Sequence, residues 1–169
     1  MADVLARHDP VPAQPVEFPG VTIALAPPMK RWSLRARNAG AMAVALGRAL
    51  PKTIGAIEDG ALMLGPDEWL LRLSEDTDLD AATDTPVSIV DVSERQIAIV
   101  IEGPRAVEVI QGGNPLDLAK FPVGTGKRTI FEGDEIVLIR EGETRFVIEV
   151  WRSFAEFVWG VLAKSASEG

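Results

Sequence analysis

The sequence predicts an α+β fold made of two repeated units, each a strand, a helix and further strands, with a mainly antiparallel sheet. Residues 31–73 and 96–151 both show a strand, a helix and then strands joined by tight turns, without clear residue identity. In both segments, alternating apolar residues mark strands, and apolar residues at helical spacing mark helices. Two such units in a chain of 169 residues indicate one domain, or two small halves that share a core.

The middle of the chain is the most strongly specified part. Residues 87–92 are rich in β-branched side chains and predict a strand, and the polar turn 93–95 follows. Residues 96–101 are too uniformly apolar for a half-exposed strand, so both faces should be covered. Pro104 suits the first position of a short helix, which Gly112 is expected to end in a left-handed conformation.

The first unit begins with residues 31–37, which alternate between two faces. The apolar face holds Trp32, Leu34 and Ala36, and the other holds Arg31, Ser33, Arg35 and Arg37. This is the period of a strand with one face in the core and the other in solvent or against a partner. Asn38 is a good cap for a helix that Pro51 closes. Asp59-Gly60 predicts a hairpin turn, because both residues must take positive φ.

The second unit contains a glycine- and proline-rich loop over residues 112–127 and then three strands. Gly133-Asp134 suits the first turn between them, and residues 141–143 suit a loop at the second. The closing helix should begin at Ser153, with Glu156 completing a capping box. Its inward stripe is expected to hold Phe154, Phe157, Val158, Val161 and Leu162.

The expected boundaries are an extended N-terminal arm over residues 1–29, a single domain over 30–165 and a tail over 166–169. Within the arm, residues 21–28 could form a short edge strand. Residues 74–86 are acidic and predict a surface connector with about two helical turns. The leader lacks the features of secretory and transit signals, and no apolar run approaches the roughly 20 residues that cross a bilayer, so we expect a cytoplasmic protein.

Composition excludes several classes of function. The net charge of −8 disfavours nucleic acid and anionic membranes as partners. The chain has no cysteine, and its single histidine is His8, which argues against disulfides, thiolate catalysis, sulfur metal sites and histidine-based triads. Residues 124–129 resemble a phosphate loop but precede an expected strand, whereas phosphate cradling needs a helix start. The carboxylates Glu75, Asp76, Asp78 and Asp80 lack the spacing of a calcium loop.

The candidate site is therefore not catalytic. Asp91, Ser93 and Arg95 are polar residues beside apolar strands, and two interpretations stay open. Asp91 and Ser93 could hydrogen-bond the turn while Arg95 pairs with a carboxylate, or the three could contact a partner. Tryptophan and arginine are enriched at interfaces, so one or two of the four tryptophans could join that surface. The candidate partner interface is Asp91, Ser93, Arg95, Trp151 and Arg152.

Four stretches of the chain resemble the gamma subunits of bacterial heterotetrameric sarcosine oxidases. They are "LGPDEWLLRL" (64–73), "VDVSERQIAIVIEGPRAVEVIQGGNPLDL" (90–118), "FPVGTGKRTIF" (121–131) and "FVIEVWRSFAEFVWGVL" (146–162). These subunits are similar in fold to the folate-binding domain of the glycine cleavage system T protein. Sequences of that protein share the Asp-Val-Ser element seen here at residues 91–93 and the Gly-Pro element seen at residues 103–104. The resemblance implies that residues 30–165 form a folate-binding-like domain.

The resemblance also implies an assembly with alpha, beta and delta subunits. That family demethylates sarcosine oxidatively to glycine, passing the one-carbon unit to tetrahydrofolate and electrons to oxygen. Its FAD, FMN, NAD, tetrahydrofolate and zinc are expected in the other subunits, and none in this chain. The Lys-Gly-Cys-(Tyr/Phe)-x-Gly-Gln-Glu signature of folate-domain relatives is absent. Two alternatives stay open: a stand-alone folate-binding or aminomethyl-transfer protein, and a gamma subunit of a related N-methyl amino acid dehydrogenase.

Overall fold

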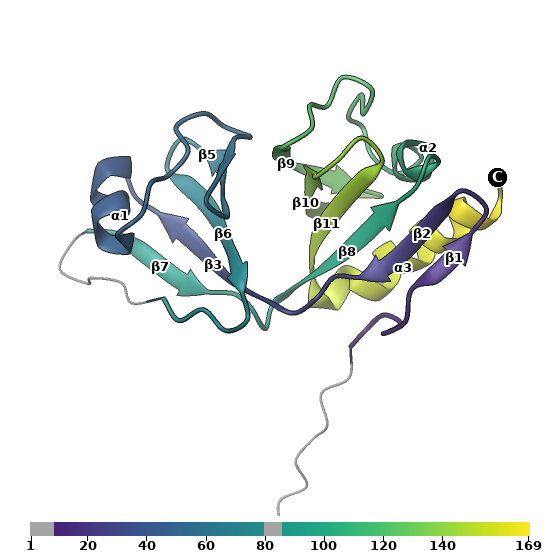
Figure 1. Ribbon diagram of the computed structural model, residues 1–169, viewed down its shortest axis with the longest axis horizontal. Helices are drawn as coiled ribbons and strands as arrows, with labels where there is room; N and C mark the ends of the chain where they lie inside the picture. Colours follow the sequence, from purple (N-terminus) through teal and green to yellow (C-terminus); the bar gives the residue numbers. More distant parts are fainter. Residues whose placement is uncertain (1–8, 80–85) are drawn as a thin grey trace, which may run out of the picture.

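Two antiparallel sheets stand side by side, with helices on their outer faces (Figure 1). The structure is a computed structural model that describes residues 9–79 and 86–169. The predicted α+β class with mainly antiparallel sheet is confirmed. The elements in chain order are β1 (Val16–Phe18), β2 (Val21–Leu25), β3 (Met29–Arg35), α1 (Ala39–Leu46), β4 (Ile57–Glu58), β5 (Ala61–Gly65), β6 (Glu68–Ser74), β7 (Ser88–Asp91), β8 (Gln96–Glu102), α2 (Ala106–Gln111), β9 (Thr125–Phe131), β10 (Asp134–Arg140), β11 (Arg145–Trp151) and α3 (Arg152–Ser167).

The two sheets repeat one strand order. The smaller sheet has the order β4-β5-β6-β3-β7, and the larger sheet has the order β1-β2-β8-β11-β10-β9. The run β4-β5-β6-β3 therefore corresponds to β9-β10-β11-β8, and α1 follows β3 as α2 follows β8. The repeated order of strand, helix and strands predicted from the sequence is confirmed.

The two halves exchange strands. β2 precedes β3 in the chain but pairs with β8 of the larger sheet, with Ile23 opposite Ile101. In the same way β7 precedes β8 but pairs with β3 of the smaller sheet, with Leu34 opposite Ile89. The two connections meet at the base of the molecule in Figure 1. The strand that precedes each half in the chain is thus part of the sheet of the other half, and this exchange connects the two sheets.

Both ends of the domain differ from their predictions. Residues 16–25 were expected within the arm 1–29, yet they form β1 and β2 of the larger sheet, and Ile23 is fully buried. The tail expected over residues 166–169 begins inside α3, where Ala166 is also fully buried. The apolar alternation of residues 21–25 is that of a strand whose partner lies far along the chain.

Three apolar clusters form the core. One lies between the larger sheet and helices α2 and α3, and another between the smaller sheet and α1. The third lies between the sheets and is formed by Leu62, Ala98, Val100, Val137, Ile139 and Val147. β8 contributes Ile99 to the first cluster and Val100 to the third. Both of its faces are therefore covered, as its uniformly apolar sequence predicts.

Several local predictions are confirmed. The Asn38 side-chain oxygen accepts hydrogen bonds from the backbone N–H groups of Gly40 and Ala41, at 2.9 and 3.3 Å, so Asn38 caps α1. Asp59 and Gly60 have φ of 46° and 81° and form the turn between β4 and β5. Helix α1 ends earlier than predicted, because Gly47 takes the left-handed conformation before Pro51 is reached.

Two other local predictions are wrong. Phe131 pairs with Asp134, so the turn between β9 and β10 is Glu132-Gly133, with φ of 48° and 95°, and not Gly133-Asp134. Gly112 has a φ of −59°, which is right-handed, so it does not end α2 in the predicted way. The helical turns expected in residues 74–86 lie partly outside the described residues, since 80–85 are among those not described.

The closing helix also differs from its prediction. α3 begins at Arg152, and its cap residue Trp151 makes no side-chain capping hydrogen bond, so the expected Ser153–Glu156 box is not the cap. The inward stripe also lies one residue further along the chain than predicted. Phe154 and Phe157 are exposed, and the buried residues are Ala155, Val158, Trp159, Leu162 and Ala166.

Candidate interface at the strand crossing

The two crossing connections line a hollow of about 680 Å³. Leu25 to Arg31 form one side of it, and Val90 to Ala98 form the other. Of the predicted site residues, Asp91, Ser93, Arg95 and Arg152 line this hollow. Trp151 lines a neighbouring hollow of about 410 Å³, which Arg95 also lines. The structure therefore brings together the five residues that sequence patterns single out.

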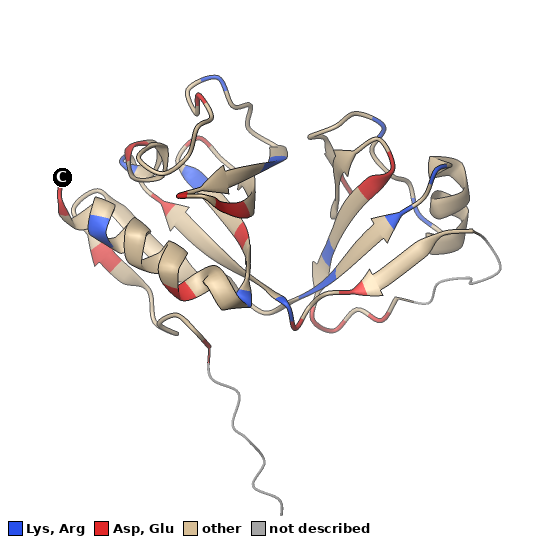
Figure 2. Ribbon diagram, turned by 180° about the vertical axis from the view of Figure 1, so that it is seen from behind, with Lys and Arg blue, Asp and Glu red and all other residues tan. Residues whose placement is uncertain are grey.

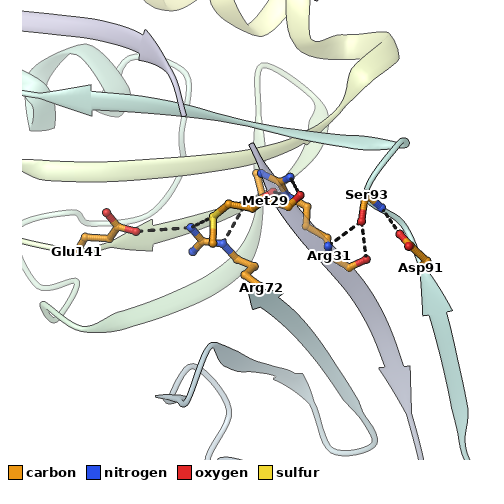
Figure 3. A network of polar contacts seen from close by, with 7 residues as sticks. Met29, Arg31, Arg72, Asp91, Ser93 and Glu141 are labelled. Carbon is orange, nitrogen blue, oxygen red and sulfur yellow. Dashed lines mark hydrogen bonds and ion pairs between the residues drawn. The ribbon is translucent and has the colours of Figure 1, made fainter. Parts of the chain in front are cut away.

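Asp91 and Ser93 stabilise the crossing itself. The Ser93 backbone N–H donates to Asp91 Oδ1 at 2.8 Å, and the Arg31 backbone N–H donates to Ser93 Oγ at 2.9 Å (Figure 3). Hydrogen bonding by Ser93 lowers the pKa of Asp91 below its ordinary value. The side chain of Ser93 contributes most to this shift, and its backbone N–H contributes next. Both side chains are thus engaged within the chain, as in the turn interpretation.

Arg95 does not follow that interpretation. In the part of the chain that the structure describes, no ion pair joins its guanidinium to a carboxylate. The group lies over the Trp151 ring instead, 4.9 Å from the ring centroid. Arg152 donates from Nη1 to Asp9 Oδ1 at 3.1 Å and from Nε to the Glu94 carbonyl at 3.3 Å. Arg95 and Trp151 therefore remain as the outward-facing pair.

A buried ionic group joins the two sheets behind the crossing. Arg31 on β3 and Arg72 on β6 are directly opposite each other in the smaller sheet, where like charges would repel. Glu149 on β11 of the larger sheet lies between them: Arg31 Nε donates to its Oε2 at 2.6 Å, and Arg72 Nε is 2.9 Å from its Oε1. Arg72 also pairs with Glu141 (Figure 3), with 3.5 Å between Arg72 Nη2 and Glu141 Oε1. Of the face expected in solvent or against a partner, Arg31 meets the chain's own second sheet, whereas Arg35 and Arg37 are exposed.

A second ionic group bridges the sheets near Trp69. Glu68 on β6 accepts a hydrogen bond from Arg128 Nη1 on β9 at 2.9 Å, and Arg35 Nη2 is 3.1 Å from the same carboxylate. The hydrogen bond from Arg128 is the main cause that lowers the pKa of Glu68 below its ordinary value. Two arginines thus hold one mostly buried carboxylate in its charged form.

The lowered pKa of Glu68 predicts a pH dependence of stability. A carboxylate with a depressed folded-state pKa contributes stability above its unfolded pKa and loses it as pH falls through the folded value. We expect Glu68→Gln to reduce the free energy of unfolding at pH 7, with a difference from the parent chain that shrinks below the ordinary value of 4.5. Urea unfolding between pH 3 and 7 measures this, with the exposed Glu143→Gln as control. A difference that does not change with pH would contradict the assignment.

The remaining sequence candidates do not assemble a catalytic group. Within residues 9–79 and 86–169, no group of three His, Asp or Glu side chains could hold a metal ion. Residues 125–129 lie within β9, so the segment that resembles a phosphate loop is not followed by the helix that such a loop needs. Figure 2 shows acidic and basic positions interspersed over both halves. None of the described helices is long and apolar enough to cross a membrane.

The fold defines the class of protein. A crystal structure of the glycine cleavage system aminomethyltransferase T from Bartonella henselae aligns with 85% of this chain and 45% of that chain, with a TM-score of 0.61 and 13% identity. At that identity the likeness shows the fold alone. The chain thus belongs to the class of α+β proteins with the fold of that structure.

The family follows from closer matches. The model of the "Sarcosine oxidase, gamma subunit family" matches residues 34–168, and the chain belongs to this family. Sarcosine oxidase subunit gamma of Corynebacterium sp. strain U-96 is 31% identical over 140 residues, covering 76% of this chain and 68% of that protein. The same subunit of strain P-1 is 30% identical over 140 residues, covering 76% and 69%. A solved heterotetrameric sarcosine oxidase from strain U-96, in complex with pyrrole 2-carboxylate, contains a chain with a TM-score of 0.81 and 29% identity, over 92% of this chain and 88% of that chain.

Sequence reasoning missed three residues that shape this region. Phe154 and Phe157 were placed in the core and are exposed, and Glu149 was read only as part of an apolar strand. Glu149 did carry a signal, because it is the one charged residue among the apolar residues 146–151. A lone carboxylate in a buried strand needs a cationic partner, and the two arginines opposite each other supply it.

Proposed function

We propose that this chain is the gamma subunit of a heterotetrameric sarcosine oxidase and has no active site of its own. The observation that carries the proposal is the family match over residues 34–168, together with a TM-score of 0.81 to a chain of such an oxidase. The whole complex would demethylate sarcosine to glycine and pass the one-carbon unit to tetrahydrofolate. The alpha, beta and delta subunits would carry FAD, FMN, NAD, tetrahydrofolate and zinc, and a cytoplasmic location belongs to the same proposal.

The role of this chain in the complex would be to bind its partner subunits. We assign the contact to the predicted interface of Asp91, Ser93, Arg95, Trp151 and Arg152. Its support is geometric: four of these residues line one hollow at the strand crossing, and the fifth lies beside it. The ionic groups around Glu68 and Glu149 connect the two sheets behind this surface, so they would keep it rigid.

Co-expression with the three other subunits of the same oxidase tests the proposal. We expect the chain to co-purify in a fixed ratio with the other three, and to show no sarcosine turnover when purified alone. Native mass spectrometry gives the ratio, and flavin absorbance together with peroxide formation reports turnover. A chain that runs alone beside an intact complex of the other subunits would contradict the proposal.

The aminomethyltransferase fold favours one alternative, a stand-alone folate-binding or aminomethyl-transfer protein. Calorimetry of the isolated chain with tetrahydrofolate separates the two functions. Micromolar binding favours the alternative, and no heat of binding favours the subunit. A substrate panel on the whole complex decides between sarcosine and another N-methyl amino acid.

A further inference from the structure

Three large aromatic side chains are exposed where β11 passes into α3. Trp151, Phe154 and Phe157 have 39%, 39% and 51% of their surface exposed. The Trp151 and Phe154 rings are stacked, with centroids 6.2 Å apart. We call these three residues the aromatic face. The other large apolar side chains exposed in the described part of the chain are aliphatic and belong to several segments: Val44, Ile54, Ile57, Val90, Val123 and Ile130.

The aromatic face is not required by the chain's own core. The inward side of α3 is already filled by buried residues such as Val158 and Leu162. Phe154 and Phe157 are three residues apart, so they are neighbours on another side of the helix. Contiguous exposed aromatic groups on a globular protein mark interaction sites, and tryptophan is prominent among the residues that dominate binding energy.

Arg95 adds a cation at the edge of the aromatic face. Its guanidinium lies over Trp151, and the described residues offer it no ion-paired carboxylate. A guanidinium fixed over an indole ring is pre-organised to bind a carboxylate. By contrast, Arg31 and Arg72 form ion pairs with Glu149, and Arg128 forms an ion pair with Glu68.

We propose that the aromatic face and Arg95 form the centre of the surface by which this chain docks onto a non-identical subunit. That subunit would present an apolar area with a carboxylate placed to meet Arg95. The inference rests on the proposed function and deepens it, because it moves the centre of the contact from the engaged Asp91 and Ser93 to Trp151, Phe154 and Phe157. A second copy of this chain is a poorer occupant, since two chains of net charge −8 repel each other.

A competition for assembly tests the inference. Parent and variant chains with different tags are co-expressed with the other subunits, and the ratio of the two tags in the purified complex is measured. The double substitution Phe154→Ala/Phe157→Ala should lower incorporation at least about tenfold. The matched control Val44→Ala/Ile54→Ala, which removes exposed apolar groups from the other half, should compete about equally.

A charge series gives a second readout that leaves Phe154 and Phe157 unchanged. Arg95→Glu should compete at least about tenfold worse than the parent chain, and Arg95→Lys should lie between them. Thermal unfolding of each isolated full chain checks that these exposed substitutions leave the fold intact.

The outcomes separate the inference from the proposed function. If the parent chain assembles and the double variant competes equally, the inference is wrong and the subunit assignment stands. If the isolated parent chain is a dimer that Phe154→Ala/Phe157→Ala converts to a monomer, the occupant is a second copy and the inference is also wrong. If the parent chain does not assemble at all, both fail.

Discussion

Replacing Glu149 by alanine will lower the free energy of unfolding by about 3–5 kcal/mol, the usual cost of breaking a buried ion pair from one side. Glu149 is fully buried between the sheets, and its two oxygens face Arg31 at 2.6 Å and Arg72 at 2.9 Å. Without the carboxylate, two cross-strand arginines would remain close together and shielded from water. The loss is therefore larger than that of an average surface ion pair.

Urea unfolding followed by circular dichroism measures this change at pH 7. The exposed pair of Asp117 with Lys120 supplies the control, and Asp117→Ala should leave the free energy of unfolding nearly unchanged. Glu149→Gln keeps a hydrogen-bond acceptor but no charge, so its free energy of unfolding should lie between those of Glu149→Ala and Asp117→Ala. A Glu149→Ala chain as stable as the control would show that Arg31 and Arg72 are satisfied in another way.

The type and order of the elements could be predicted because they depend on local patterns. Trp32, Leu34 and Ala36 alternate along β3 and are buried, and Asp59-Gly60 takes the two positive φ values that its turn requires. The repeated order of strand, helix and strands also follows from the order of such patterns. These features need only neighbouring residues, so one sequence is enough to predict them.

The pairing of strands could not be predicted in the same way. The residues of β2 and β7 each predict a strand. No local pattern shows that β2 pairs with β8 of the second unit, or that β7 pairs with β3 of the first unit. The proline-rich leader predicts an extended arm, and no local pattern shows that β2 pairs with β8. The same applies to Arg31 on β3, whose partner Glu149 on β11 lies more than a hundred residues along the chain.

The residues of the candidate interface could be predicted from their types. The side of α3 that faces outward could not. Asp91, Ser93, Arg95, Trp151 and Arg152 do gather at the crossing. The helical spacing of apolar residues predicts Phe154 and Phe157 in the inward stripe of α3. Each residue turns an α-helix by about 100°, so the buried positions Ala155 and Val158 turn their neighbours Phe154 and Phe157 away from the core.

Gly103→Ala is expected to destabilise the chain by about 3 kcal/mol or more, because it combines a strained backbone with a backbone clash. Gly103 has a φ of 135°, which side-chain-bearing residues rarely adopt, and it follows β8 where the chain turns toward α2. A Cβ there would lie 2.4 Å from the Gly20 carbonyl oxygen and 2.9 Å from Val21 Cα. That carbonyl accepts the Arg105 backbone N–H at 3.0 Å, so the clash would separate the start of β2 from β8.

The same substitution in α3 is the matched control for Gly103→Ala. A Cβ on Gly160 would have no heavy atom within 4 Å, and alanine is the better helix former, so Gly160→Ala should stabilise the chain by up to about 1 kcal/mol. Thermal unfolding of the two variants should therefore shift in opposite directions. Hydrogen exchange of β2 amides gives the second readout, with faster exchange in Gly103→Ala alone. If both variants unfold like the parent chain, β2 does not pack against the β8–α2 junction, and the strand exchange itself is in doubt.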